Sequence, residues 1–318
     1  RPVAGGRVRC RRDPEAAGEL RRGIGGDEDR DGVGKEVHRS PSAWVLSAQE
    51  AYVGRVLDTL RDMDNVLYEV VNEAIPESVS WQYHLIRFIQ QYEREHQYVA
   101  HPVGMTFFQL GEFGGGDNTA LFDSPADWIS PGGYTKYARN PPTADGRKVI
   151  LLDTDHIHGI GGDQDFVWES FFRGYNPIYM DPLDAPHELT IGEPVRNEPQ
   201  HERARVAMGE ARRWATTLDL RRAIPRGDVA STGYCLAEPG REYLVYIPAG
   251  SASSPSTDDN GARPVTLNLN GAGGSFSVEW IDVEARRAIL VEPIQGERER
   301  LFTVPFPGAT LLHLKTRS

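Results

Sequence analysis

Carboxylate and amide side chains follow two short apolar runs of the chain, each of the length of a buried strand. The first run ends at Asn72 and Glu73, and the second ends at Asp153 and, two residues on, Asp155. In a barrel of parallel strands, catalytic residues lie at the carboxyl ends of the strands. Two carboxylates on different strands of one barrel are suited to cleaving glycosidic bonds. The sequence therefore predicts a glycosidase site formed by two strand ends.

The second strand end offers two candidates for a nucleophile. Asp153 and Asp155 alternate with Thr154, so both are expected to face the same side of the strand. One would then be the nucleophile and the other a hydrogen-bonding partner, unless one only caps the following loop. Asp155 is favoured because it lies nearer the barrel mouth, beside His156, which we expect to contact substrate. Alternatively, His156, His158 and the two aspartates are metal ligands; the favoured interpretation requires no metal or cofactor.

Strands alternate with helical patterns over residues 41–227, which predicts a domain with a parallel α/β sheet or barrel. Ser47 and Glu50 have the spacing of a capping box that begins the first helix. Further helices are predicted around 81–92, 166–172 and 204–218, and strands around 102–109, 127–130, 149–153 and 177–181.

The chain changes character at both ends of this domain. Residues 1–40 contain no aromatic residue and are rich in Arg, Gly, Asp and Glu, so we expect them to be disordered or atypical. Residues 228–318 contain short alternating apolar runs separated by Gly, Pro, Ser and Asn, which predicts a small antiparallel β-sandwich. The predicted fold class is α/β plus β.

Counting strands indicates an incomplete barrel. If Glu73 ends strand 4, Asp153 ends strand 7 and Asp181 ends strand 8, because a βα unit takes roughly 31 residues. Strands 1 to 3 would need roughly 90 residues before Ser47, but 46 precede it. We therefore expect a partial (β/α)8 barrel of about strands 4 to 8, truncated at its amino terminus or given a wrong start.

The bulk composition excludes several classes of partner. The net charge of -11 argues against nucleic acid, which favours a basic face. No apolar run approaches the roughly 20 residues that cross a bilayer, so no membrane partner is expected. Cys10 and Cys235 fit neither a disulfide framework nor a zinc site, and Cys235 is predicted to be a core residue. The sequence does not specify an oligomeric state.

The motifs resemble a known family. The run Tyr68–Glu73 resembles the strand-4 signature of the clan of retaining (β/α)8 glycoside hydrolases, in which an Asn-Glu pair supplies the acid/base and its neighbour. A wider pattern resembles a bacterial group, akin to the apiosidase-like barrels, whose carboxyl-terminal β-domain is named for collagen binding. The likeness covers about residues 23–318 and rests on Asp153-Thr154-Asp155-His156, Trp168, Phe172-Arg173-Gly174 and Pro177–Pro182.

The resemblance implies roles for the first strand end. Glu73 would be the acid/base, with a raised pKa and about 5–5.5 Å from the nucleophile. Asn72 would hold the sugar 2-hydroxyl. The clan's strand-7 nucleophile is usually Glu, whereas this chain offers only Asp, whose arm is shorter by one bond. Trp168 and Phe108 are candidates to stack on sugar faces, although aromatic residues of barrels are more often part of the core.

Arg173 is expected to pair with Asp181 or with an active-site carboxylate and to keep that group ionised, or else to lie on a solvated helix face. The favoured function is a retaining glycoside hydrolase acting on plant or microbial oligo- or polysaccharide, secreted or periplasmic in its full-length form. One alternative is an inactive barrel fragment whose sandwich binds carbohydrate or matrix. The other alternative is a metal-dependent hydrolase.

Overall fold

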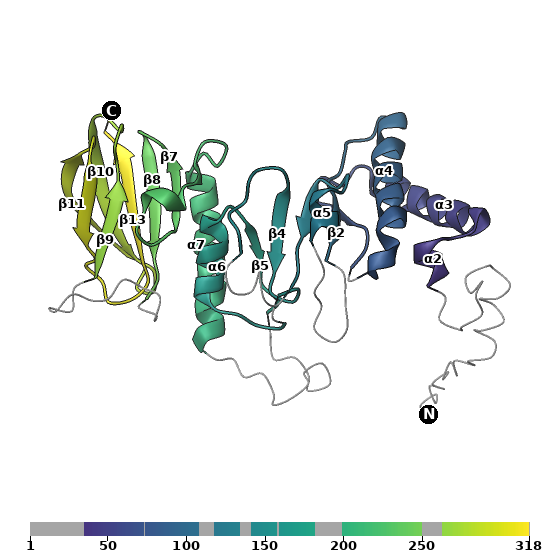
Figure 1. Cartoon of the computed structure of the whole chain (residues 1–318), viewed down its shortest axis with the longest axis horizontal. Helices are drawn as coiled ribbons and strands as arrows, with labels where there is room; N and C mark the ends of the chain where they lie inside the picture. The colour runs from purple at the N-terminus through teal and green to yellow at the C-terminus, as the bar shows by residue number, and fades with distance from the viewer. Residues whose placement is uncertain are drawn as a thin grey trace, which may run out of the picture. The chain divides into compact units, whose positions relative to one another are not determined.

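The computed structural model describes most of the chain between residues 35 and 317 and divides it into two compact units (Figure 1). The first unit comprises the described residues up to 107 together with 119–127, and the second comprises residue 118 and those from 128 onward. None of the described helices is long and apolar enough to span a membrane. The described residues are 35–72, 74–107, 118–133, 141–157, 159–181, 199–249 and 263–317.

The first unit packs helices against a pair of parallel strands. Strands β1 and β2 pair in register, with Tyr68 opposite Val103. All four residues of β2 are buried, as expected of a strand covered on both faces. Helix α4 turns an apolar stripe inward, with Leu85 and Ile89 buried one turn apart. The elements of this unit are α2 (Glu36–Arg39), α3 (Ala43–Leu60), β1 (Tyr68–Glu69), η1 (Pro76–Ser78), α4 (Val79–Glu95), β2 (Val103–Thr106) and α5 (Thr119–Phe122).

The first long helix begins earlier than the sequence predicts. Helix α3 starts at Ala43, and its N-cap is Ser42, whose side chain accepts a hydrogen bond from the Val45 N–H at 3.4 Å. The capping box predicted at Ser47 is therefore wrong, because the Ser42 hydroxyl already satisfies a free N–H of the first turn. Helix α2 lies before it, inside the segment for which no ordered structure was predicted.

The second unit begins with three parallel strands. Ile129 of β3 pairs with Ile150 of β4, and Leu152 of β4 pairs with Pro177 of β5. Helix α6 connects β4 to β5, and its N-cap Asp163 accepts a hydrogen bond from the Phe166 N–H. The strand–helix alternation predicted for this stretch is confirmed. The elements are β3 (Trp128–Ser130), β4 (Val149–Asp153), α6 (Gln164–Phe172), β5 (Asn176–Ile178) and α7 (Pro199–Thr217).

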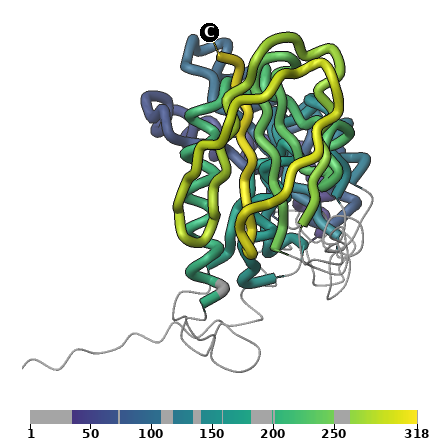
Figure 2. The backbone as a smooth tube through the Cα atoms, turned by 90° about the vertical axis from the view of Figure 1, so that its left-hand side faces the viewer, coloured from purple at the N-terminus to yellow at the C-terminus, as the bar shows by residue number. Residues whose placement is uncertain are grey.

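The second unit ends with two antiparallel sheets, which face the viewer in Figure 2. The six-stranded sheet has the order β11-β10-β13-β8-β7-β6, and β12 pairs with β9 in a sheet of two. The antiparallel character predicted for this part of the chain is confirmed. The bounds are β6 (Ile224–Pro225), η3 (Gly227–Val229), β7 (Cys235–Glu238), β8 (Glu242–Ile247), β9 (Pro264–Asn268), β10 (Ser275–Asp282), β11 (Arg287–Gln295), β12 (Glu299–Thr303) and β13 (Thr310–Thr316).

The six-stranded sheet is covered on both faces. Val245 of β8 lies in a core shared with the two-stranded sheet, whereas the next residue, Tyr246, lies in a core shared with α6 and α7. All six residues of β8 are consequently buried, which explains its continuous apolar run. Cys235 is fully buried, as predicted. The predicted domain boundary at 227/228 falls within this unit.

Candidate functional site

In the first unit, the chain leaving β1 is held on two sides. The Val71 N–H donates to the side-chain oxygen of Gln82 on α4 at 3.3 Å. The Val71 carbonyl accepts from the Thr106 hydroxyl at the end of β2 at 3.0 Å. These bonds fix the backbone immediately before Asn72, which is exposed. Glu73, the predicted acid/base, lies outside the described residues.

In the second unit, the chain turns sharply where β4 ends. The Asp153 carboxylate accepts a hydrogen bond from the Asp155 N–H at 2.9 Å, which is the local bond by which Asp starts a turn. Thr154 between them is fully buried. Its hydroxyl accepts from the Met180 N–H at 2.9 Å, and its own N–H donates to the Ile178 carbonyl at 3.1 Å. The turn is therefore fastened to the carboxyl end of β5.

This turn corrects one premise of the sequence analysis. Strand β4 ends at Asp153, and Asp155 lies in the turn that follows. Strand alternation therefore does not set the direction of the Asp155 side chain. Both aspartates are half-buried. The Asp153 carboxylate holds the backbone of Asp155 by accepting the hydrogen bond from its N–H. The assignment of Asp155 as the nucleophile stays a prediction.

Burial raises the pKa of the Asp153 carboxyl above its ordinary value. The hydrogen bond from the Asp155 N–H and the charge of His156 oppose this effect in part, while the neighbouring Asp155 carboxylate adds to it. Asp153 therefore binds a proton more readily than a free aspartate does. Because a nucleophile must be ionised, this shift counts against Asp153 for that role.

His156 joins the ends of β3 and β4. Its Nδ1 lies 2.8 Å from the hydroxyl of Ser130, the last residue of β3. Its carbonyl accepts from the Gly133 N–H at 3.3 Å. Both side chains of the His–Ser pair are buried, so the imidazole is held at the end of β3, where its charge acts on Asp153. Sequence reasoning missed Ser130, although it ends a predicted strand just before a Pro-Gly-Gly run.

Helix α7 supplies two polar side chains at the end of β5. The His201 Nδ1 lies 2.6 Å from the Tyr179 hydroxyl, and Arg205 donates two hydrogen bonds of 2.7 Å to the carboxylate of Asp181. Burial raises the pKa of the Tyr179 phenol, and the charge of Asp181 adds to this rise. No sequence pattern links α7 to these residues, because the contacts cross a gap of more than twenty positions.

Arg173 has a different partner from the one predicted. Its guanidinium pairs with Glu169 at 3.0 Å and donates to the Tyr234 hydroxyl at 3.2 Å, whereas Asp181 pairs with Arg205. Arg173 is the C-cap of α6 and precedes β5, so it lies at the amino end of that strand. The predicted pairing of Arg173 with Asp181 is wrong, because each residue meets an oppositely charged side chain nearer to it.

Trp168 belongs to the core of the second unit. It is fully buried, and its ring stacks on Tyr246 of β8 with centroids 5.8 Å apart. A sugar cannot reach this ring, so the predicted stacking role is wrong. Phe108, the other aromatic candidate, and His158, a metal ligand in the alternative interpretation, lie outside the described residues. Within the described part of the chain, no group of three His, Cys, Asp or Glu residues is placed to hold a metal ion.

Comparisons with known proteins give a similarity of fold. No protein family and no curated protein sequence matches the chain. Its structure is similar to that of a glycoside hydrolase, with a TM-score of 0.60 and 10% identity over 85% of this chain and 69% of that one. It is also similar to a glycoside hydrolase family 5 protein from Bacteroides vulgatus ATCC 8482, with a TM-score of 0.59 and 11% identity over 85% and 66%. The chain has a glycoside hydrolase-like fold.

Proposed function

We propose that this protein is a retaining glycoside hydrolase acting on plant or microbial polysaccharide. The observation that carries the proposal is the turn at the end of β4, where two half-buried aspartates lie two residues apart and the Asp155 N–H donates to the Asp153 carboxylate. The similarity of fold to glycoside hydrolases supports it, as does the fixed backbone that leads to Asn72 and Glu73.

We propose that this site belongs to the later part of a (β/α)8 barrel. Strands β1 to β5 would be strands 4 to 8, since helices separate most of them in the chain order and catalytic residues of such barrels end the strands. Glu73 then follows strand 4, and Asp153 ends strand 7. A retaining mechanism requires the carboxyl groups of the acid/base and of the nucleophile, here Glu73 and Asp155, to lie about 5–5.5 Å apart.

Each residue has a defined chemical role in this proposal. Glu73 donates a proton to the glycosidic oxygen as the bond to the leaving group breaks, while the Asp155 carboxylate attacks the anomeric carbon. Glu73 then removes a proton from the water that releases the sugar. Asn72 holds the 2-hydroxyl of the sugar. Asp153 fixes the turn that presents Asp155.

The proposal is tested with the full chain and a series of aryl glycosides that differ in leaving group. Glu73→Gln should lower turnover by about 10²–10⁴-fold for poor leaving groups, since these need protonation. An activated nitrophenyl glycoside should be affected much less. The matched control is Glu77→Gln, which removes the same charge at an exposed position four residues away and should leave turnover unchanged. Equal losses on all leaving groups would show that Glu73 is not the acid.

A further inference from the structure

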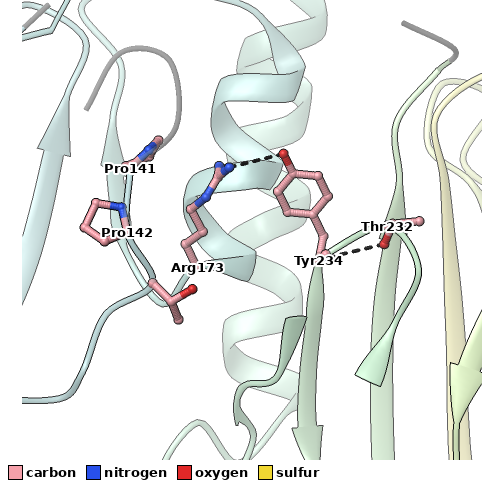
Figure 3. Close-up of a pocket in the computed structure, with 7 residues that line it drawn as sticks. Pro141, Pro142, Arg173, Thr232 and Tyr234 are labelled. Carbon is pink, nitrogen blue, oxygen red and sulfur yellow. Dashed lines mark hydrogen bonds between the residues drawn. The ribbon is translucent and has the colours of Figure 1, made fainter. Parts of the chain in front are cut away.

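A hollow of about 510 Å³ opens on the second unit, away from the candidate active site (Figure 3). This volume lies within the range of about 300–1,000 Å³ that is usual for sites that bind small molecules. Its lining comes from the segment before β4, the end of α6 and the turn before β7. The lining residues are Pro141, Pro142, Thr143, Arg173, Thr232, Gly233 and Tyr234.

The hollow lies at the amino ends of β4 and β5. The Arg173 carbonyl accepts a hydrogen bond from the Ala144 N–H at 2.9 Å, and the Tyr175 hydroxyl donates to the Pro142 carbonyl. These bonds tie together the two segments that lead into the strands. Asp153 ends the same strand β4 at the opposite, carboxyl end. The hollow is therefore separate from the candidate catalytic residues of this unit.

The positive charge of Arg173, which lines the hollow, is paired with a carboxylate. Arg173 is bound to the Glu169 carboxylate at 3.0 Å, and its guanidinium lies 4.9 Å from the centre of the Tyr234 ring. Burial raises the pKa of the Tyr234 phenol to about 12, so this hydroxyl is neutral at physiological pH. The lining thus carries little net charge, which favours a neutral ligand over an ionic one.

The rest of the lining combines apolar rings with hydroxyl groups. The rings of Pro141 and Pro142 line the hollow opposite Tyr234 (Figure 3). The Thr232 hydroxyl accepts from the Tyr234 N–H at 3.3 Å, which leaves its own proton able to donate. Thr143, which also lines the hollow, is exposed. A pyranose has the matching chemistry, since its C–H faces pack on rings while its hydroxyls both donate and accept.

We propose that this hollow binds one or two residues of a neutral oligosaccharide chain as an accessory site, at the end of the strands opposite the hydrolytic centre. The choice of a sugar rests on the proposed function, whereas the existence of a site for a neutral polyhydroxyl ligand rests on the lining itself. An accessory site of this kind would hold a polymer on the protein between cleavage events.

The test is an amide NMR titration of the full-length Glu73→Gln chain, which spares the probe from turnover, with xylohexaose and cellohexaose as separate probes. We expect the amide signals of Thr143, Thr232 and Gly233 to shift with saturation. In Thr143→Trp, whose indole would fill part of the hollow, these shifts should need at least tenfold more probe. The matched control is Thr303→Trp, at an exposed position of β12, which should titrate like the parent chain.

The outcomes separate this inference from the proposed function. If neither hexaose shifts the signals of the hollow, or if Thr143→Trp leaves the titration unchanged, the accessory site is disproved, whatever the activity. If the hollow binds a hexaose while the unmodified chain hydrolyses no glycoside, the accessory site stands and the proposed function fails.

Discussion

Both ends of the parallel strands β4 and β5 carry polar residues, but the two ends arrange them differently. At the carboxyl end, Asp153 and Asp155 lie two residues apart in one turn, beside a buried His–Ser pair. At the amino end, Arg173 is neutralised by Glu169 and covered by a tyrosine. A carboxyl group whose pKa is raised by burial, as that of Asp153 is, is suited to chemistry. A balanced ion pair among rings and hydroxyls is suited to binding without chemistry.

The largest expected effect falls at the carboxyl end. Asp155→Asn should lower turnover by about 10³-fold or more, because an amide cannot form the glycosyl ester. Asp153→Asn should cost no more than about tenfold, since the amide oxygen can still accept the Asp155 N–H bond. The measurement is kcat on an activated aryl glycoside. A larger loss for Asp153→Asn would reverse the two roles.

Substitution of Trp168 tests the packing of α6 against the six-stranded antiparallel sheet. Trp168→Ala should lower the free energy of unfolding by about 3–5 kcal/mol, because it empties a fully buried indole site. The exposed Trp44, at 62% exposure, offers a matched control, and Trp44→Ala should change stability by no more than about 0.5 kcal/mol. Denaturant titration measures both. If Trp168→Ala kept full stability but lost substrate affinity, its assignment to the core would be contradicted.

The smallest expected effect is a pH dependence at Asp153. The pKa of Asp153 is raised in the folded state, so its contribution to stability is fully present below the unfolded pKa of about 3.9 and is lost as pH rises through the folded value. Asp153→Asn removes this titration. The variant should therefore gain stability over the parent chain as pH rises from about 4 toward neutrality. A constant difference in melting temperature across this range would contradict the raised pKa.

The sequence predicted the elements better than the contacts. Strands β4 and β8 and helix α7 follow from long apolar or periodic runs, and each is present. Strand β11 has no such run, because most of its residues are exposed and its side chains show no clear alternation. The predicted start of helix α3 was wrong. Helical sequence follows both Ser42 and Ser47, and only the observed cap bond distinguishes the two serines.

The site residues could be predicted only where a local sequence pattern marked them. Asp153 and Asp155 were found because they follow an apolar run. Of the two relations expected for them, the shared strand face is not observed, since one backbone hydrogen bond turns the chain out of the strand, and Asp153 caps the turn that follows. His201 and Arg205 reach the ends of β5 residues from a separate helix. Such long-range contacts depend on packing, which spacing along one chain does not encode.

The central claim is that a carboxylate at the end of β4 forms a covalent bond to the sugar. The direct test is to incubate the full chain with a 2-deoxy-2-fluoro glycoside that carries an activated leaving group, which slows release of the intermediate. Proteolysis and mass spectrometry then locate the sugar. We expect one sugar per chain, attached to Asp155. Turnover of the parent glycoside with inverted anomeric configuration and no attached sugar would contradict it.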